Sequence, residues 1–138
     1  MDRALTAEVK AWIEDDPDPV TASHLQKLLD AGDEAMLRTY FSGFLQFGTA
    51  GLRGPNGPGP SCMNRAVVGR AAAGIAAYMK ARGMTRVVIG RDARYGSADD
   101  AIESAEIFSG AGMEVFLLPR ALPTPVLAYA TTALTADD

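Results

Sequence analysis

The stretch Arg86-Val87-Val88-Ile89-Gly90 decides the fold class, because a short apolar run that ends in glycine is typical of a buried β-strand. A helical pattern begins at Ser97 and ends at Gly110 and Gly112, and a second apolar run follows at Met113–Leu118. Two strands joined by a helix form a crossover unit, in which the strands lie parallel. The spacing therefore predicts an α/β fold with a mixed, largely parallel sheet and flanking helices.

Helical patterns also lie on both sides of this unit. Asn64 can cap a long helix that ends before Gly83. Pro123-Thr124-Pro125 predicts a last helix to about Thr132, because Thr124 suits the N-cap and Pro125 the first helical position. The apolar stripes that we expect to face inward are Val67, Val68, Ala71, Ile75, Tyr78 and Met79 in the first helix, and Ile102, Ala105 and Phe108 in the helix after Ser97.

The first 43 residues predict short acidic helices. One follows Thr6, a second fits the capping box formed by Ser23 and Gln26, and a third can be capped by Asp33. Pro17 and Pro19 end the first helical pattern. We therefore predict an acidic helical extension over residues 1–43, followed by one domain over residues 44–138.

Composition excludes several classes of protein. Of the 138 residues, 48% are apolar and 22% charged, which is typical of a folded domain rather than a disordered chain. No apolar run approaches the roughly 18 residues of a membrane span, and the single cysteine, Cys62, cannot form an internal disulfide. We expect a soluble cytoplasmic protein without a membrane partner. The net charge of −4 argues against nucleic acid as a partner.

The charge is unevenly distributed. Residues 41–96 contain eight basic residues, seven of them arginine, against one acid, Asp92. Most of the glycine lies in the same segment. Arginine beside glycine backbone suits a compact anion such as phosphate, because the guanidinium fork is bidentate and backbone N–H groups can approach closely. The alternative for each arginine is an ordinary solvated surface charge.

The motif Phe47-Gly48-Thr49-Ala50-Gly51-Leu52-Arg53-Gly54 combines these features. Phe44–Phe47 is apolar enough for a strand, and the composition of Gly48–Gly59 predicts a loop. Gly48 and Gly51 let the backbone turn tightly, Thr49 offers a hydroxyl, and Arg53 offers its fork to an anionic oxygen. We predict that these four residues bind phosphate; the alternative is a turn with an incidental arginine.

This motif closely resembles the opening signature of the α-D-phosphohexomutases, the family of phosphoglucomutase, phosphomannomutase and phosphopentomutase. The resemblance covers residues 44–134 and continues through Gly57-Pro58-Gly59-Pro60, Met63-Asn64-Arg65, Ile89–Ser97 and Pro123-Thr124-Pro125. The acidic helices, with Trp12 and Asp16-Pro17-Asp18-Pro19, are similar to the extension of the phosphoglucomutase/phosphopentomutase branch. The resemblance implies an incomplete first domain of an isomerase that moves a phosphoryl group within a sugar phosphate, through a phosphoserine and a bisphosphate intermediate.

The resemblance also implies roles for particular residues. Arg53 lies in the catalytic cleft, where it positions or neutralises the moving phosphoryl group. Arg91, Asp92 and Arg94 border the active site, and Asp92 and Arg94 hold the serine loop in place. The whole enzyme uses Mg²⁺ and a glucose 1,6-bisphosphate-type activator, and we expect no metal ligand on this chain. Its substrates are sugar phosphates, but the residues present do not indicate which sugar is preferred.

One sequence near the start of the chain is similar to the family's catalytic serine loop. Thr21-Ala22-Ser23-His24 is similar to the family's serine loop, but Ser23 lies 24 residues before the motif and we expect it to cap a helix. We expect the true serine loop to lie beyond Asp138, so that this chain is an N-terminal fragment. Such a fragment is expected to be inactive alone, to bind the remaining domains, and to self-associate through exposed apolar surface. The alternative function is a non-catalytic phosphate- or sugar-phosphate-binding module.

Overall fold

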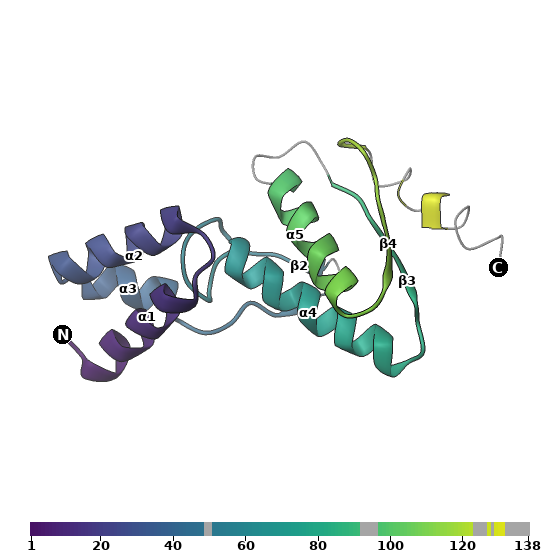
Figure 1. Ribbon diagram of the computed structural model, residues 1–138. Helices are drawn as coiled ribbons and strands as arrows, with labels where there is room; N and C mark the ends of the chain where they lie inside the picture. Colours follow the sequence, from purple (N-terminus) through teal and green to yellow (C-terminus); the bar gives the residue numbers. More distant parts are fainter. Residues whose placement is uncertain (49–50, 92–96, 123–126, 128, 132–138) are drawn as a thin grey trace. The chain divides into compact units, whose positions relative to one another are not determined.

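A computed structural model of the chain describes residues 1–48, 51–91, 97–122, 127 and 129–131 (Figure 1). The chain divides into two compact units, Met1–Val68 and Gly69–Asp138. The fold is mixed α/β, with helices and two small two-stranded sheets. In this described part, no helix is both long and apolar enough to cross a membrane.

The first unit opens with three short helices, α1 (Arg3–Asp15), α2 (Pro19–Ala31) and α3 (Glu34–Tyr40), which pack together (Figure 1). Each contributes buried apolar side chains to one core: Leu5, Val9 and Trp12 from α1, Leu25 from α2, and Leu37 from α3. Leu45, Leu52 and Val67 belong to the same core. The three helices and the segment that contains the glycine motif therefore share one hydrophobic core.

Two of the three predicted helix starts are wrong. Asp2, not Thr6, caps α1, and its carboxylate accepts a hydrogen bond from the backbone N–H of Ala4 at 2.9 Å. Asp18, not Ser23, caps α2, with its carboxylate 2.9 Å from the backbone nitrogen of Val20. Pro19 explains the second error, because proline at the first helical position pre-sets the backbone for a helix that starts before Ser23.

The third predicted start is confirmed. Asp33 caps α3, and its carboxylate accepts a hydrogen bond from the backbone N–H of Met36 at 3.2 Å. Asp33 also follows Gly32, whose φ of +68° ends α2 in the left-handed conformation that favours glycine. The two helices are thus separated by a local signal that can be read directly from the sequence.

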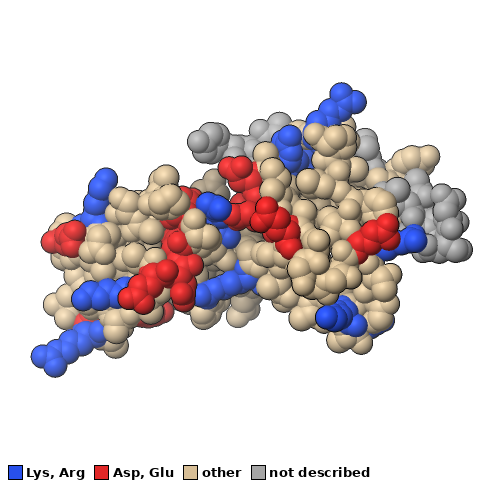
Figure 2. Space-filling view, viewed as in Figure 1, with Lys and Arg blue, Asp and Glu red and all other residues tan. Residues whose placement is uncertain are grey.

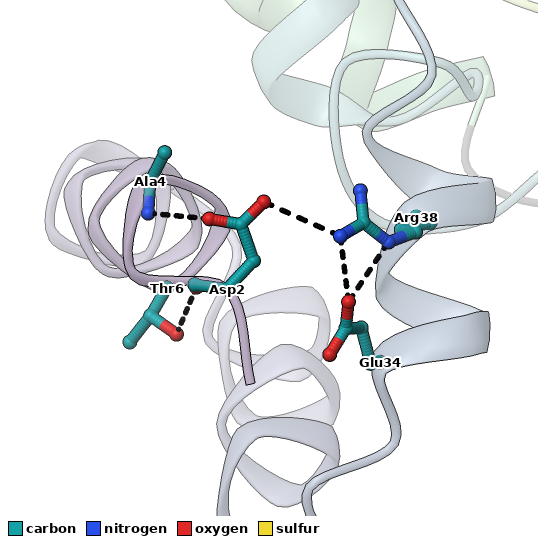
Figure 3. Close-up of polar contacts among 5 residues, drawn as sticks. All are labelled: Asp2, Ala4, Thr6, Glu34 and Arg38. Carbon is teal, nitrogen blue, oxygen red and sulfur yellow. Dashed lines mark hydrogen bonds and ion pairs between the residues drawn. The ribbon is translucent and has the colours of Figure 1, made fainter.

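Ionic contacts link the beginning of α1 to α3 (Figure 3). The guanidinium of Arg38 lies 3.3 Å from the carboxylate of Asp2 and 2.6 Å from that of Glu34. The backbone N–H of Ala4 and the Arg38 guanidinium lower the pKa of Asp2, in that order of importance. Figure 2 shows acidic and basic side chains interspersed over this three-helix segment, in which Arg38 pairs with both Asp2 and Glu34.

A short hairpin follows the helices. Strand β1 (Phe47–Gly48) pairs antiparallel with β2 (Gly51–Leu52), and Phe47 lies opposite Leu52. The prediction of a strand over residues 44–47 and of a loop from residue 48 is therefore corrected: the strand starts at Phe47, and the motif itself turns back on it. Gly48 and Gly51 form the second register pair of the two strands, and both are exposed.

The second unit contains the predicted parallel pair. Strands β3 (Arg86–Ile89) and β4 (Glu114–Leu117) are parallel, with Val87 opposite Val115 and Ile89 opposite Leu117. Helix α5 (Ser97–Gly110) connects them and packs on both. Helix α4 (Arg65–Ala81) begins in the first unit and contributes Ala72 and Ala76 to the core of the second, together with Phe108 and Met113.

Three residues of the predicted inward faces are wrongly placed. Ile75, Tyr78 and Ile102 are exposed, at 40%, 56% and 49% of their surface, whereas the buried positions on these helices include Ala72, Ala76 and Ala101. Ala72 and Ala76 pack with Phe108 and Met113 in the core of the second unit, and Val87 and Val115 of the sheet pack against this cluster. Val67 and Phe108 are buried as predicted, and Met79 packs against the core of the second unit. The predicted cap at Thr124 and Pro125 lies outside the described residues.

The corrected start of α2 gives a direct test. Asp18→Ala should lower the free energy of unfolding by about 1 kcal/mol, because it removes the N-cap acceptor. Ser23→Ala should change it by no more than about 0.5 kcal/mol, because Ser23 lies within the helix and is exposed. Urea unfolding followed by circular dichroism measures both values. A larger loss for Ser23→Ala than for Asp18→Ala would show that α2 begins at the capping box.

Candidate phosphate-binding site

Arg53 directly follows the second strand of the hairpin. Its side chain is exposed, and it forms neither a hydrogen bond nor an ion pair with any residue that the structure describes. Gly51, two residues earlier, has a φ of +94°, which L-residues with a side chain rarely adopt. The hairpin is therefore followed by an exposed guanidinium whose donors are not taken up by any described residue.

The backbone of Arg53 is held on both sides. Leu52 is half-buried and packs against the core of the first unit. Gly54 lies so close to Leu45 that a Cβ atom at position 54 would be 2.7 Å from Leu45 Cδ2. Apolar packing thus fixes the residues before and after Arg53, while the Arg53 side chain itself stays in solvent.

A closed loop follows, from Pro55 to Met63. Its ends meet through the backbone, since the N–H of Met63 donates to the carbonyl of Pro55 at 2.8 Å and that of Gly57 donates to the carbonyl of Met63 at 3.3 Å. Compact loops with adjoining ends are often packed by their own side chains. Here Pro58 is fully buried, so the loop is an ordered part of the unit.

The loop also contacts the C-terminal end of α3. Gly59 has a φ of +85°, and a Cβ atom there would lie 2.6 Å from the backbone oxygen of Tyr40. The backbone N–H of Ser61 donates to that same oxygen at 3.2 Å. Only glycine permits both this conformation and this approach at position 59, which explains why the GPGP sequence is needed where it stands.

Asn64 joins the loop to α4. The predicted cap is confirmed, because the side-chain oxygen accepts a hydrogen bond from the backbone N–H of Val67 at 2.9 Å. The side-chain Nδ2 has a role that the sequence analysis missed: it donates to the carbonyls of Gly57 at 2.9 Å, Gly59 at 2.7 Å and, more weakly, Cys62 at 3.3 Å. The available signal was the set of three prolines in the loop, Pro55, Pro58 and Pro60, which lack N–H donors.

Arg91 occupies the predicted place in the second unit. It follows β3 at the carboxyl end of the strand, is half-buried, and its carbonyl accepts a hydrogen bond from the N–H of Leu122 at 3.1 Å. Thr49, Asp92 and Arg94 lie outside the described residues. Since Arg53 and Arg91 belong to different units, their convergence on one site stays a prediction.

The remaining candidates do not form a second site. Ser23 is exposed within α2, and its neighbour His24 makes an edge contact with the ring of Tyr40, with ring centres 5.8 Å apart. Cys62 is buried, and burial raises the pKa of its thiol. The described residues contain no cluster of three or more His, Cys, Asp or Glu side chains that could hold a metal ion.

Residues 45–138 match the model of the "Phosphoglucomutase/phosphomannomutase, alpha/beta/alpha domain I". The chain belongs to this family. The match includes the hairpin, Arg53, the loop and Asn64, and the α/β/α description of the domain agrees with the mixed α/β fold of the chain.

Individual phosphomutases show the same relation. Mouse phosphopentomutase is 33% identical over 97% of this chain and 23% of its own length. A probable phosphomannomutase of Haemophilus influenzae is 52% identical over 49% of the chain and 14% of its own length. The phosphoglucomutase of Staphylococcus haemolyticus is 38% identical over 65% of the chain and 17% of its own length. The chain thus spans less than a quarter of these relatives, and no solved structure matches it.

The contact between Gly59 and Tyr40 can be tested with a matched pair of glycines. Both Gly59 and Gly32 have a positive φ, but a Cβ atom at position 32 would meet nothing within 4 Å. Gly32→Ala should therefore lower the free energy of unfolding by about 1–2 kcal/mol, which is the cost of placing a side chain in the left-handed backbone conformation. Gly59→Ala should lower it by about 1–3 kcal/mol more, because the new methyl group must also displace the loop from α3.

Trp12 provides the measurement. It is the only tryptophan, it is buried, and its ring lies edge-on to that of Phe41, with ring centres 6.0 Å apart. Urea unfolding followed by tryptophan fluorescence therefore reports on the core of the first unit. Equal losses for the two variants would mean that the loop does not approach Tyr40 closely.

Proposed function

We propose that this chain supplies the phosphate-contacting arginine of a phosphohexomutase, with Arg53 binding a phosphoryl group of a sugar phosphate. The observation that carries the proposal is the exposed Arg53 guanidinium, which has no partner among the described residues and stands on a backbone fixed by Leu52 and Gly54. Gly48, Thr49 and Gly51 complete the proposed site with backbone N–H groups and a hydroxyl.

The chemistry of phosphoryl transfer suits such an arrangement. The transferred group carries charge on several oxygens, and catalysis depends mainly on positioning and on electrostatic stabilisation. A guanidinium can contact two of those oxygens at once and remains charged at all physiological pH values. A backbone that is already ordered lowers the entropy cost of forming these contacts.

For the whole enzyme we propose reversible transfer between the 1- and 6-positions of a hexose phosphate, or the equivalent transfer in a pentose phosphate, through a phosphoserine and a bisphosphate. The relatives are named for different sugars, as phosphomannomutase, phosphopentomutase and phosphoglucomutase, so they support the shared phosphoryl chemistry rather than one sugar. We assign residues 1–43 to a helical extension and residues 44–138 to domain I. Arg91, Asp92 and Arg94 are proposed to position the serine loop. Mg²⁺ and a glucose 1,6-bisphosphate activator are proposed for the whole enzyme, without a ligand from this chain.

Phosphate binding by the chain tests the role of Arg53. We expect amide chemical shifts of the hairpin to move on titration with inorganic phosphate at constant ionic strength. Arg53→Ala should weaken binding at least tenfold, and Arg53→Lys should bind less tightly than the wild type because a lysine cannot make the bidentate contact. Arg3→Ala is the control, because it removes an equal charge from an exposed arginine of the same unit. Equal affinities of Arg53→Ala and Arg3→Ala would refute the site.

The chain alone is expected not to interconvert sugar phosphates. Its Thr-Ala-Ser-His sequence lies within α2, where Ser23 continues a regular helix, and loss of a nucleophile costs many orders of magnitude in rate. The assay uses glucose 1-phosphate, glucose 1,6-bisphosphate and Mg²⁺, with the intact mass of the chain measured afterwards for added phosphate. Turnover that disappears in Ser23→Ala would place the nucleophile on α2 and contradict this proposal.

A further inference from the structure

We propose that Asn64 is a positioning residue for Arg53, holding the loop from Pro55 to Met63 closed so that the guanidinium is presented in one place. This inference rests on the proposed function, because it assigns Asn64 a part in phosphate binding by Arg53. It goes further than the helix-capping role, which concerns only the oxygen of the Asn64 side chain.

The Asn64 side chain forms hydrogen bonds with both α4 and the loop. Its Oδ1 accepts from the N–H of Val67 in the first turn of α4 at 2.9 Å. Its Nδ2 lies 2.9 Å and 2.7 Å from the carbonyl oxygens of Gly57 and Gly59, with Cys62 O at 3.3 Å as a third, shared acceptor. One half-buried side chain therefore binds the loop on one side and the helix on the other.

The loop depends on such a donor. Pro58 and Pro60 have no backbone N–H, and both are buried together with Gly59. A buried carbonyl that loses its donor costs roughly 1–3 kcal/mol. Without the Asn64 amide, the carbonyls of Gly57 and Gly59 would regain hydrogen bonds only by turning toward water. This movement would open the loop.

Backbone hydrogen bonds and the side chain of Leu45 connect the loop to the residues next to Arg53. Its closing hydrogen bond, from Met63 N–H to Pro55 O at 2.8 Å, lies two residues after Arg53. The N–H of Leu45 donates to the carbonyl of Pro60 at 3.4 Å, and the side chain of Leu45 is the surface against which Gly54 packs. Opening the loop therefore releases the backbone on the carboxyl side of Arg53.

Two variants separate capping from loop closure. Serine is as good an N-cap as asparagine, so Asn64→Ser preserves α4 but is too short to reach the loop carbonyls. Asn64→Asp keeps the acceptor for Val67 N–H but replaces the donor with a second oxygen. Asn56→Ser is the matched control, because Asn56 lies in the same loop and its exposed side chain forms no hydrogen bond with the described residues.

Cys62 provides a readout that a simple capping role would not change. It is the only thiol of the chain, lies inside the loop, and exposes 3% of its surface. We expect Asn64→Ser and Asn64→Asp to react with an aromatic disulfide reagent at least tenfold faster than the wild type, at a temperature where their circular dichroism matches it. Asn56→Ser and Arg53→Ala should react at the wild-type rate.

Phosphate affinity links loop closure to Arg53. Asn64→Ser should bind inorganic phosphate about tenfold more weakly, and saturating phosphate should slow labelling of Cys62 in the wild type but not in Arg53→Ala, because ligand and closed loop stabilise each other. Wild-type labelling or wild-type affinity in Asn64→Ser, with Arg53→Ala impaired, would overturn the inference and leave the proposed function intact. Unchanged affinity in Arg53→Ala would instead overturn the proposed function, and the inference with it.

Discussion

Burial of one shared apolar core sustains the first unit. α3 has seven residues and α1 and α2 have thirteen each, lengths at which isolated helices are marginal in water. Their stability comes from Val9, Leu25 and Leu37, which are fully buried against one another and against side chains of the following segment, including Leu45 and Leu52. The core thus draws residues from both sides of position 43, and the helices and the hairpin stabilise each other.

The same core determines which part of the motif is fixed and which is free. Leu52 packs against the core, and Gly54 lies against the side chain of Leu45. Arg53 lies between these two residues, with its side chain exposed to water. A solvated guanidinium is stable without a partner, so the fold does not need to satisfy it. Ordering the backbone in advance means that an anion would have to restrain only the side chain of Arg53.

The parts of this structure that could be predicted are those determined by local signals. The strands β3 and β4, their parallel pairing, and the caps at Asp33 and Asn64 follow from runs, spacing and residue type. Ser23 was misread because two valid cap signals compete within five residues, and Asp18 wins through Pro19. The predicted inward positions of Ile75, Tyr78 and Ile102 are wrong because alanine gives a weak apolar signal, yet Ala72, Ala76 and Ala101 are buried on these helices. The phosphate-binding role of Arg53 is predicted from its chemistry and stays a prediction, whereas the donor contacts of Asn64 depend on where three carbonyls meet in space.

The loop shows why that last feature escapes a reading of the sequence. Prolines at positions 58 and 60 restrict the unfolded chain, which lowers the entropy lost on folding, but they also remove two N–H groups from a buried segment. Glycine at position 59 permits the approach to Tyr40 and leaves its own carbonyl facing inward toward Asn64. Each residue choice is favourable for a turn, yet together they create a shortage of donors that only a side chain from outside the turn relieves. A single asparagine meets this need and caps a helix, so the local signal for capping conceals the tertiary role.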